Sequence, residues 1–265
     1  MSKDKILILD ADSLIYIAGN KNSIEEAIQS LEYKLMGIQE ETKCNKVLGF
    51  LTSGKCFRYN IDPFYKHKRV LLEKPKFYNT LKNYLIETKE FITDKNLEAD
   101  DLVSITRTVL YSLGIKNVIA STDKDVLHQI PGENFDYYIS KDTNTFRGFL
   151  NTTKEDSMRF LFKQCLMGDS IDGIEGIKGI GLSKSEQILN TVGDEDFNNS
   201  LFDRYFKKTL NVYKEYYKND ILALKHLNKT LRLVYILRNE EEINQECDSK
   251  EFKYKLDYII KKLNL

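Results

Sequence analysis

Carboxylate side chains in this sequence recur where predicted strands end and where predicted helices begin. Three short apolar runs, at Lys5–Asp10, Lys46–Leu51 and Asn117–Thr122, are typical of strands that are buried on both faces, as in a parallel sheet. The acids that follow these runs or open other elements are Asp10, Asp12, Glu98, Asp100, Asp101, Asp123, Asp125, Asp169 and Asp172. Because the carboxyl ends of parallel strands meet at one edge of a sheet, Asp10 and Asp123 are expected to face the same crevice. Carboxylate oxygens suit Mg²⁺ or Mn²⁺, and two such ions can stabilise the attacking and the leaving oxygen of a phosphodiester cleavage.

Each group of acids also has a purely structural interpretation. Acids in the first turn of a helix complement the helix dipole, which alone would explain Glu98, Asp100 and Asp101. An Asp that directly follows a strand is often only a turn residue. Because several such groups end elements of one predicted sheet, the pattern favours a metal site over these alternatives.

A basic segment rich in aromatic residues follows the second predicted strand. Its basic residues are Arg58, Lys66, His67, Lys68 and Arg69, and its aromatic residues are Phe57, Tyr59, Phe64 and Tyr65. This mixture suits a nucleic-acid strand, because the charges can bind phosphates and the rings can stack on unpaired bases. A solvated basic face is the alternative, and composition alone does not separate the two.

A glycine-rich loop over residues 168–181 precedes another predicted helix. Glycine lets the backbone approach a phosphate closely, and the amides of a helix N-terminus bind phosphate. Ser183 and Glu186 match a capping box, which predicts that the helix begins at this point, and Lys184 adds a positive charge. The alternative is an ordinary helical hairpin in which Ser183 is only a cap.

The order of the predicted elements indicates an α/β part followed by a helical part. Strands alternate with helices up to about residue 150; a capping box at Ser23–Glu26 opens one helix, and Phe77–Phe91 is another. From about Thr152 onward only helices are predicted, interrupted by Gly168–Gly181. We therefore expect a mostly parallel-sheet domain over residues 1–150 and a helical region over residues 151–265.

The composition fits a globular protein of a reducing compartment. The 265 residues are 42% apolar and 30% charged, and no apolar run is long enough to cross a membrane. The four cysteines contain no CxxC pair, which argues against a zinc ribbon or a disulfide framework and favours the cytoplasm. The 40 basic and 40 acidic residues balance, so any interaction with nucleic acid must rest on local charge.

The motifs and their order resemble those of the 5′ nuclease family. They are ILDADSLIY, FR(x)4PxYKxxR at Phe57–Arg69, LEADDLV, STDKDVL and GDSIDGIEGIKGIG. The resemblance spans Lys5 to about Leu189 and extends to the 5′–3′ exonucleases and flap endonucleases of phages and to the 5′ nuclease domain of bacterial DNA polymerase I. It implies a PIN-like domain, a helix–three-turn–helix at about residues 165–190, and Mg²⁺-dependent hydrolysis of DNA near 5′ ends and branch points.

The resemblance also implies a role for each group of residues. One metal site would be served by Asp10, Glu98, Asp100 and Asp101, and a second by Asp123, Asp125, Asp169 and Asp172. The residues implied to contact the scissile phosphate, and so to act in catalysis, are Lys66 and Arg69. Those implied to contact DNA are Arg58, Tyr65, Lys68, Gly179, Gly181, Ser183 and Lys184. For Tyr65, stacking on the terminal base and internal packing remain equal alternatives. The loop before Ser183 would also hold a monovalent cation through its carbonyls.

The sequence departs from the family in two places. The family usually has an Asp just after the second strand, where this chain has Leu51, Thr52 and Ser53. Asp12 could compensate, although a turn or helix-cap role is favoured for it, so the first metal site is expected to be the weaker one. The family also has a helical arch, for which this chain leaves only Val70–Lys76, too short for two helices.

Two other functions were weighed against a nuclease. A haloacid-dehalogenase-type phosphatase would use Asp10, Asp12, Thr122 and Gly168-Asp169, but its last motif should follow a strand and here follows a helical stripe. A structure-specific DNA-binding protein without catalysis is suggested only by the missing carboxylate. We therefore expect a monomeric 5′ nuclease that uses two Mg²⁺ or Mn²⁺ ions on DNA flaps, nicks or ends. RNA–DNA hybrids remain open as substrates, and so does the choice between exonuclease and flap endonuclease.

Overall fold

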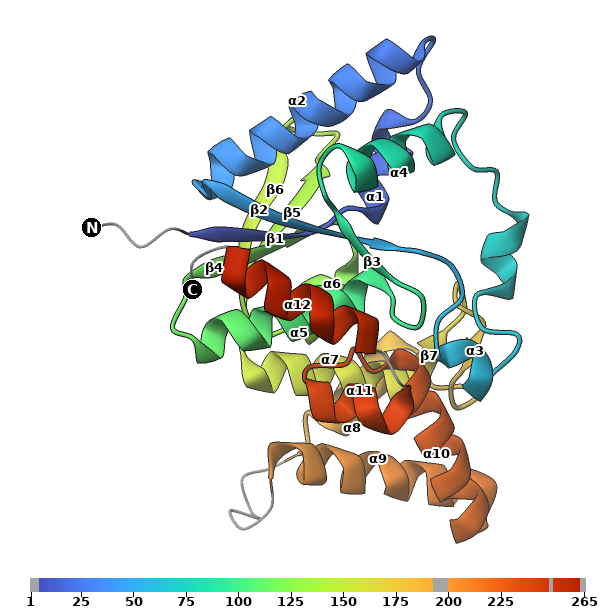
Figure 1. Ribbon diagram of the computed structural model, residues 1–265. Helices are drawn as coiled ribbons and strands as arrows, with labels where there is room; N and C mark the ends of the chain where they lie inside the picture. Colours follow the sequence, from blue (N-terminus) through green and yellow to red (C-terminus); the bar gives the residue numbers. More distant parts are fainter. Residues whose placement is uncertain (1–4, 193–199, 248–249, 263–265) are drawn as a thin grey trace. The chain divides into compact units, whose positions relative to one another are not determined.

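The computed structural model describes residues 5–192, 200–247 and 250–262, which fold into two compact units (Figure 1). The first unit contains the chain up to Phe57, the segment Glu73–Thr152 and the chain from Ile236 onward. The second unit contains Arg58–Leu72 and Thr153–Tyr235. The change of unit after Thr152 lies beside the boundary expected near residue 150. Two segments do not follow a simple division at this boundary. Arg58–Leu72 belongs to the second unit although it precedes residue 150, and the chain from Ile236 onward belongs to the first unit although it follows that residue.

Hydrogen bonds between distant residues explain this exchange of segments. Arg58 donates from Nε to the carbonyl oxygen of Leu233 at 3.1 Å, which ties its segment to the second unit. The amide of Leu237 donates to Oδ1 of Asp101 at 3.0 Å, which ties the C-terminal segment to the first. The partners are 175 and 136 positions apart, so a local sequence pattern carries no signal for either contact.

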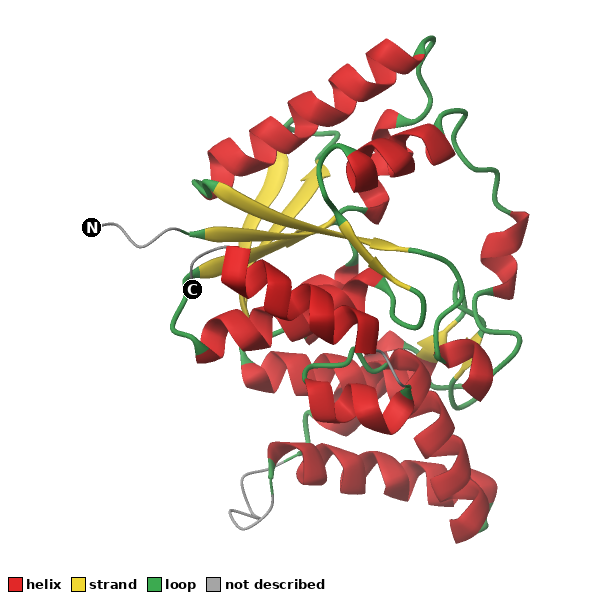
Figure 2. Ribbon diagram, viewed as in Figure 1, coloured by secondary structure: helices red, strands yellow, loops and turns green. Residues whose placement is uncertain are grey.

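A six-stranded sheet forms the centre of the first unit (Figure 2). Its strands are β1 (Ile6–Asp10), β2 (Lys46–Thr52), β3 (Ile92–Asp94), β4 (Asn117–Ser121), β5 (Gly132–Ile139) and β6 (Phe146–Thr152), and their order is β3-β2-β1-β4-β5-β6. All neighbouring pairs are parallel except β5 and β6, which are antiparallel. The central strand β1 pairs with β2 and β4, so the predicted strands at these three places and the mostly parallel sheet are confirmed.

Helices cover both faces of this sheet (Figure 1). One face carries α1 (Asp12–Ala18), α2 (Ile24–Thr42) and α4 (Tyr78–Glu87), and the other carries α5 (Ala99–Ser112) and α12 (Lys250–Lys262). The short helices α6 (Lys124–Gln129) and α11 (Glu240–Glu246) complete the unit. The predicted cap of α2 is confirmed, because Oγ of Ser23 accepts a hydrogen bond from the amide of Glu26 at 3.2 Å.

The main core lies between β1 and the helices α1, α2 and α4. Leu7 and Leu9 project from one face of β1 into a cluster that includes Leu31 of α2 and Leu81 of α4, all with 1% exposure or less. The same side of the sheet requires a glycine in β2. A Cβ atom at Gly49 would lie 2.3 Å from the ring of Phe91, so the ring packs directly on the strand backbone.

The second unit is built from helices around a small hairpin. Its elements are α3 (Arg58–Ile61), the 3₁₀ helix η1 (His67–Leu71), α7 (Lys154–Met167), β7 (Gly168–Asp169), β8 (Ile174–Glu175), α8 (Leu182–Leu189), α9 (Leu201–Tyr217) and α10 (Asp220–Val234). Helix α7 packs on α9, where the hydroxyl of Tyr213 donates to the carbonyl of Cys165 at 2.7 Å. The strands β7 and β8 pair within the predicted interruption of the helices. No helix in the described part of the chain is long and apolar enough to span a membrane.

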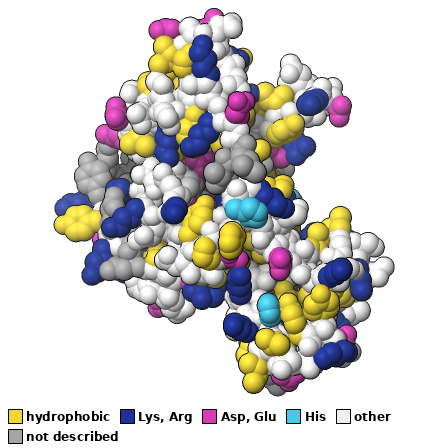
Figure 3. Space-filling model, turned by 90° about the vertical axis from the view of Figure 1, so that its right-hand side faces the viewer, with side chains coloured by type: hydrophobic (Ala, Val, Ile, Leu, Met, Phe, Trp, Pro, Cys, Tyr) yellow, Lys and Arg dark blue, Asp and Glu magenta, His cyan; other side chains and the backbone are white. Residues whose placement is uncertain are grey.

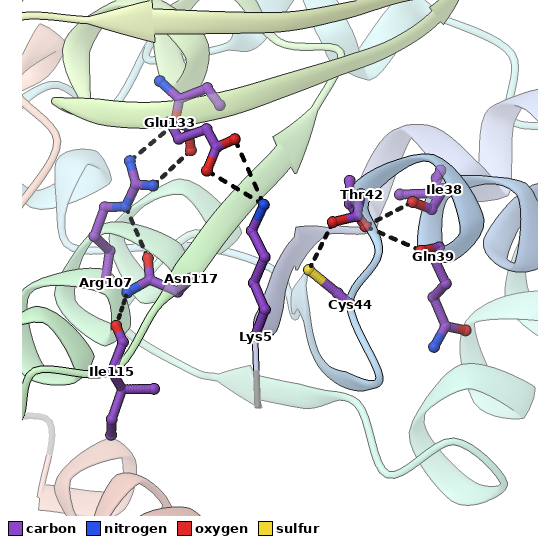
Figure 4. Close-up of polar contacts among 10 residues, drawn as sticks. Lys5, Ile38, Gln39, Thr42, Cys44, Arg107, Ile115, Asn117 and Glu133 are labelled. Atoms are coloured by element: carbon purple, nitrogen blue, oxygen red, sulfur yellow. Dashed lines mark hydrogen bonds and ion pairs between the residues drawn. The ribbon is translucent and has the colours of Figure 1, made fainter. Parts of the chain in front are cut away.

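A buried arginine fastens the start of β5 (Figure 4). Arg107 of α5 is 6% exposed and donates to the carbonyl oxygens of Pro131 and Glu133 at 2.8 and 2.6 Å. It also donates to the side chains of Asn117 and Asn134, both at 3.0 Å. Each of these hydrogen bonds supplies a donor to an oxygen that is buried or partly buried.

This network predicts a large stability effect at Arg107. Arg107→Met keeps the aliphatic stem but removes four hydrogen bonds, and we expect the free energy of unfolding to fall by about 3 kcal/mol or more. The matched control is Arg147→Met on β6, whose exposed guanidinium lies 3.5 Å from Asp136 and should contribute less than about 1 kcal/mol. Urea unfolding of the three proteins measures both values, and equal losses would contradict the assignment.

Candidate functional site

Asp10 is a buried carboxylate at the carboxyl end of β1. Its side chain is 3% exposed; Oδ2 accepts a hydrogen bond from the hydroxyl of Ser121 at 2.6 Å, and Oδ1 accepts one from the amide of Asp12 at 3.3 Å. Burial, and then the neighbouring charges of Asp12 and Asp123, raise the pKa of Asp10 from 3.8 to about 7. The two hydrogen bonds therefore offset the cost of burial only in part, and a cation bound here would stabilise the charged form.

Asp123 lies at the same edge of the sheet, at the end of β4. Its amide donates to the hydroxyl of Ser121 at 2.9 Å, and the same hydroxyl donates to Asp10. Asp123 is also the N-cap of α6, where its Oδ1 accepts a hydrogen bond from the amide of Asp125 at 2.8 Å. The expectation that Asp10 and Asp123 share one edge of the sheet is confirmed.

The three acids of the EADD motif occupy the N-terminus of α5 but differ in their surroundings. Glu98 is the N-cap and forms a capping box with Asp101. Asp101 is fully buried; its Oδ2 accepts from the amide of Glu98 at 3.2 Å and its Oδ1 accepts from the amide of Leu237 at 3.0 Å. Both oxygens of Asp101 thus bind backbone amides, and the bond to Glu98 is the capping role that the sequence left open. Asp100 is half-buried.

The end of β2 shows what stands where the family usually has an acid. Leu51 is in the core, Oγ1 of Thr52 accepts from the amide of Ala99 at 3.0 Å, and the hydroxyl of Ser53 donates to a carbonyl at 2.5 Å. The side chain of Asp12 reaches this point from α1, because its Oδ1 accepts from the amide of Thr52 at 3.1 Å. The N-cap of α1 is instead Ala11, which makes no side-chain cap. The sequence favoured a turn or helix-cap role for Asp12. In the structure Asp12 is not the N-cap of α1, and its side chain binds the end of β2.

The carboxylates of the first unit suit a hard cation in their chemistry but do not form a ready-made cage. Among the residues that the structure describes, no three Asp, Glu, His or Cys side chains are grouped as a set that could hold a metal ion. All the predicted donors are oxygens, and the charge of Asp10 is disfavoured by its surroundings, because burial raises its pKa. The residues thus fit a divalent ion by type, while the assignment of each acid to a metal stays a prediction.

In the second unit, the basic segment lies directly against the loop between β7 and β8. Oδ1 of Asp172 lies 2.6 Å from Nη2 of Arg69, and its Oδ2 lies 3.9 Å from Nζ of Lys66. Backbone contacts support this arrangement, since the amide of Lys66 donates to the carbonyl of Asp172 at 2.8 Å and Nζ of Lys68 donates to the carbonyl of Ser170 at 2.8 Å. Two predicted phosphate-binding residues therefore share a partner that is itself a predicted metal ligand.

The loop that carries Asp169 and Asp172 has little freedom. Oδ1 of Asp169 accepts from the amides of Ile171 at 2.8 Å and Asp172 at 3.3 Å. Gly168 has φ +70°, and a Cβ atom there would lie 2.3 Å from the carbonyl oxygen of Ile174. Only glycine allows this close approach of two backbones, so the hairpin fixes the position of both acids in this unit.

Comparison with known proteins agrees with the motifs. No protein family model matches the chain. An exodeoxyribonuclease of Enterobacteria phage T3 is 33% identical over 147 residues, which are 54% of this chain and 46% of the phage protein. A 5′–3′ exonuclease of Buchnera aphidicola is 25% identical over 227 residues, 83% of this chain and 68% of the relative. The flap endonuclease of bacteriophage T5, solved with DNA and metal ions, has a TM-score of 0.59 at 18% identity and covers 87% of this chain and 99% of its own.

The chain resembles the 5′ nucleases in sequence and in fold. It spans about half the length of the phage T3 protein and about two thirds of the Buchnera protein. The expected PIN-like α/β fold with a helical C-terminal part is confirmed by the likeness to the T5 enzyme. The phosphatase alternative is not favoured by any of these relatives, and Gly168-Asp169 follows the helix α7 rather than a strand.

Two of the residues predicted to contact DNA are buried in this 5′ nuclease-like chain. Arg58 is 2% exposed, and its Nη2 donates to the carbonyl of Tyr235 at 2.6 Å. Tyr65 is 4% exposed and packs edge to face on Tyr59, with ring centroids 5.6 Å apart. Neither side chain offers a surface to a DNA strand. For Arg58 the burial favours a structural role in place of the expected DNA contact, and for Tyr65 it favours internal packing, one of the two alternatives that the sequence left open.

The remaining predicted contacts with the DNA backbone are exposed. They are Lys68, Gly179, Gly181, Ser183 and Lys184. The predicted capping box of Ser183 and Glu186 is wrong, because α8 begins at Leu182 with Gly181 as its N-cap and without a side-chain cap. Oε1 of Glu186 lies instead 3.5 Å from Nζ of Lys163. The N-terminus of α8 is thus open, and its first amides remain available to an anion.

The raised pKa of Asp10 predicts how stability depends on pH in the absence of metal. Because the folded pKa of about 7 exceeds the ordinary 3.8, Asp10 favours the folded state at low pH, and this contribution is lost as the pH rises through 7. At pH 8 in EDTA, Asp10→Asn should therefore unfold at a higher temperature than wild type, and its free energy of unfolding should be larger by up to roughly 4 kcal/mol. Both differences should vanish near pH 4.

The matched control for this experiment is Glu25→Gln. Glu25 is a first-turn acid of α2 whose pKa is lowered, chiefly by a backbone hydrogen bond, so its removal should never stabilise the protein as the pH rises. Thermal unfolding from pH 4 to 8 measures all three proteins. An Asp10→Asn curve that follows the wild-type curve at every pH would show that Asp10 carries no such penalty.

Proposed function

We propose that the chain is a metal-dependent 5′ nuclease that hydrolyses phosphodiester bonds near the 5′ ends or branch points of DNA. The observation that carries this proposal is the buried Asp10, which lies at the carboxyl edge of a parallel sheet beside Asp12 and Asp123 and whose charge is disfavoured until a cation binds. The nuclease relatives and the DNA and metal ions bound to the T5 enzyme support the same chemistry.

Two Mg²⁺ or Mn²⁺ ions are proposed. One would be held by Asp10, Glu98, Asp100 and Asp101, and the other by Asp123, Asp125, Asp169 and Asp172. When bound, these ions would supply an activated water and would stabilise charge on the attacking and leaving oxygens. For Asp101, both oxygens of which bind amides, a contact to an ion would require one of these bonds to be exchanged.

Lys66 and Arg69 are proposed to hold the scissile phosphate. In the structure both basic groups face Asp172, and Arg69 makes the closer contact at 2.6 Å. A phosphate would compete with Asp172 for Arg69, and a cation would compete with Arg69 for Asp172. Substrate and metal would therefore exchange this ion pair together, which places the positive charge on the phosphate where negative charge develops in the transition state.

The open N-terminus of α8 is proposed to bind the backbone of duplex DNA without sequence preference. Gly179, Gly181, Ser183 and Lys184 are exposed there and offer amides, a hydroxyl and one ammonium group. We also propose a monovalent cation bound by carbonyls of this loop, action as a monomer in the cytoplasm, and RNA–DNA hybrid as a second substrate.

Removing one predicted metal ligand tests the nuclease directly. Asp125→Asn should lower the cleavage rate of a 5′-flap or nicked duplex by about 100-fold or more in Mg²⁺, because it removes a ligand charge from the second metal site. DNA binding in EDTA should remain, since this step uses the basic groups and not the acids. Gel assays of cleavage and anisotropy of binding measure the two quantities.

Asp142→Asn is the matched control, because Asp142 is an exposed acid in the turn between β5 and β6. This variant should cleave like wild type. If Asp125→Asn also cleaves like wild type, the second metal site is assigned to the wrong residues. If wild type binds the flap but never cleaves it, the chain is a DNA-binding protein without catalysis.

The route of the 5′ strand is a separate prediction. Between the end of η1 at Leu71 and the start of α4 at Tyr78 the structure contains no helix. Part of this segment is held to the end of α1, since the amide of Phe77 donates to the carbonyl of Gly19 at 3.0 Å. An arch of two helices is therefore absent from this stretch of the chain, and a free 5′ end should be less strictly required.

A flap blocked at its 5′ end by streptavidin before the enzyme is added measures this requirement. We expect the blocked flap to be cleaved at a rate close to that of the free flap. The control is the same flap blocked after preincubation with enzyme in Ca²⁺, which traps any strand that has already threaded. Complete inhibition by early blocking alone would mean that the strand still threads through a closed frame.

A further inference from the structure

The most exposed aromatic ring of the basic segment belongs to Phe64. Its side chain is 72% exposed, whereas the ring of the next residue, Tyr65, is 4% exposed. A single exposed apolar residue is common on protein surfaces and by itself indicates no function. What distinguishes Phe64 is the way in which the surrounding backbone holds it outward.

The turn that carries Phe64 is fixed on its N-terminal side by Asp62. Oδ1 of Asp62 accepts from the amide of Phe64 at 2.9 Å, and the carbonyl of Asp62 accepts from the amide of Tyr65 at 3.0 Å. Asp62 is itself held by Lys229 of α10, whose Nζ lies 2.7 Å from Oδ2. This contact with Lys229 is also the main reason that the pKa of Asp62 is lowered.

His67 fixes the same turn on its C-terminal side. The amide of His67 donates to the carbonyl of Phe64 at 3.1 Å, and Nδ1 lies 2.8 Å from the same oxygen. The ring of His67 rests on Gly173, where a Cβ atom would lie 2.9 Å from Nδ1, and it meets the ring of Phe64 edge to face. Phe64 is therefore presented to solvent by a turn that is bound on both sides, so little further ordering is needed when a ligand stacks on it.

Positive charge surrounds this ring along the chain. Lys66, Lys68 and Arg69 follow within five positions, and Lys68 and Arg69 are exposed. The nearest acids in sequence and contact, Asp62 and Asp172, are already paired with Lys229 and Arg69. Basic and hydrophobic side chains also lie interspersed on the face of the molecule shown in Figure 3. A flat apolar ring beside cations matches the two parts of a nucleotide, a base and a phosphate.

We propose that Phe64 is a base-stacking residue that binds one unpaired nucleobase of the substrate, while Lys68 and Arg69 bind the adjoining phosphates. The base must be unpaired or terminal, because bases inside a duplex already stack on their neighbours and offer no free face to a protruding ring. The inference rests on the proposed function, since it gives the substrate a single-stranded part and names the side chain that recognises it.

Substitutions of Phe64 test the stacking. In EDTA, Phe64→Ala should weaken binding of a short single strand by about 5- to 100-fold, whereas Phe64→Tyr should bind like wild type and Phe64→Leu should not restore affinity. A dumbbell duplex closed at both ends by ethylene-glycol linkers in place of nucleotide loops has no unpaired base, and it should be bound by all variants within about twofold. Because the ring is exposed, the unfolding temperature should not change. Tyr111→Ala, which removes a ring that is 80% exposed on α5, is the matched control.

The chain contains no tryptophan, which allows a direct optical test. Phe64→Trp creates a single indole at the proposed contact, and its emission should be quenched by a single strand but not by the dumbbell. Tyr111→Trp should respond to neither. The inference is overturned if Phe64→Ala binds the single strand like wild type and the indole at position 64 is not quenched, while Lys68→Ala still weakens binding. If wild type binds none of these DNAs, the proposed function itself fails.

Discussion

The burial of the Asp10 carboxylate is the constraint on which the arrangement of the first unit depends. A parallel strand that is apolar on both faces carries its last residue to the edge of the sheet, where Asp10 is 3% exposed. Ser121 and the amide of Asp12 bind its two oxygens, and the hydroxyl of Tyr137 donates to its carbonyl at 2.8 Å. These contacts hold the group in place without making its charge favourable. The fold thus keeps an electrostatic penalty that only protonation or a cation removes, which is typical of a site selected for chemistry and not for stability.

The buried acid of the second unit, Asp172, has surroundings of the opposite charge. Asp172 is also buried, at 6% exposure, but its oxygens face Arg69 and Lys66. A buried acid beside bases is stable without metal, whereas a buried acid beside other acids is not. The two units therefore differ in what they need from the substrate and its ions. The first unit requires a positive charge beside Asp10. In the second unit, Arg69 is released from Asp172 only when another cation takes its place there.

The sequence predicts well what depends on local patterns. The apolar runs locate β1, β2 and β4, and the acids at their ends follow from the parallel sheet. It misses β6, because this edge strand alternates between exposed and half-buried residues, and it misses β5, because the buried stretch of β5 includes the polar Asn134 and Asp136 and so gives no continuous apolar run. It also assigns Arg58 to DNA and leaves the role of Tyr65 open, since the burial of a single side chain depends on partners such as Leu233, which lies 175 positions from Arg58. The motif marks the basic segment but does not indicate which of two adjacent rings, Phe64 or Tyr65, is exposed.

The end of β2 shows how a departure from a family pattern is accommodated physically. With no carboxylate at Leu51, Thr52 or Ser53, the backbone amide and carbonyl of Thr52 are bound by side chains from two helices. Asp12 of α1 accepts from the amide of Thr52 at 3.1 Å, and Lys82 of α4 donates to its carbonyl at 2.6 Å. Lys82 is half-buried, and burial lowers its pKa while the charge of Asp12 raises it, so each of the two charges supports the other. Asp12 brings its negative charge to the strand end that lacks one, and Lys82 offsets part of that charge. An acid on β2 itself, without a neighbouring lysine, would attract a cation more strongly than Asp12 and Lys82 together do. This is the physical basis for expecting the first metal site to be the weaker one.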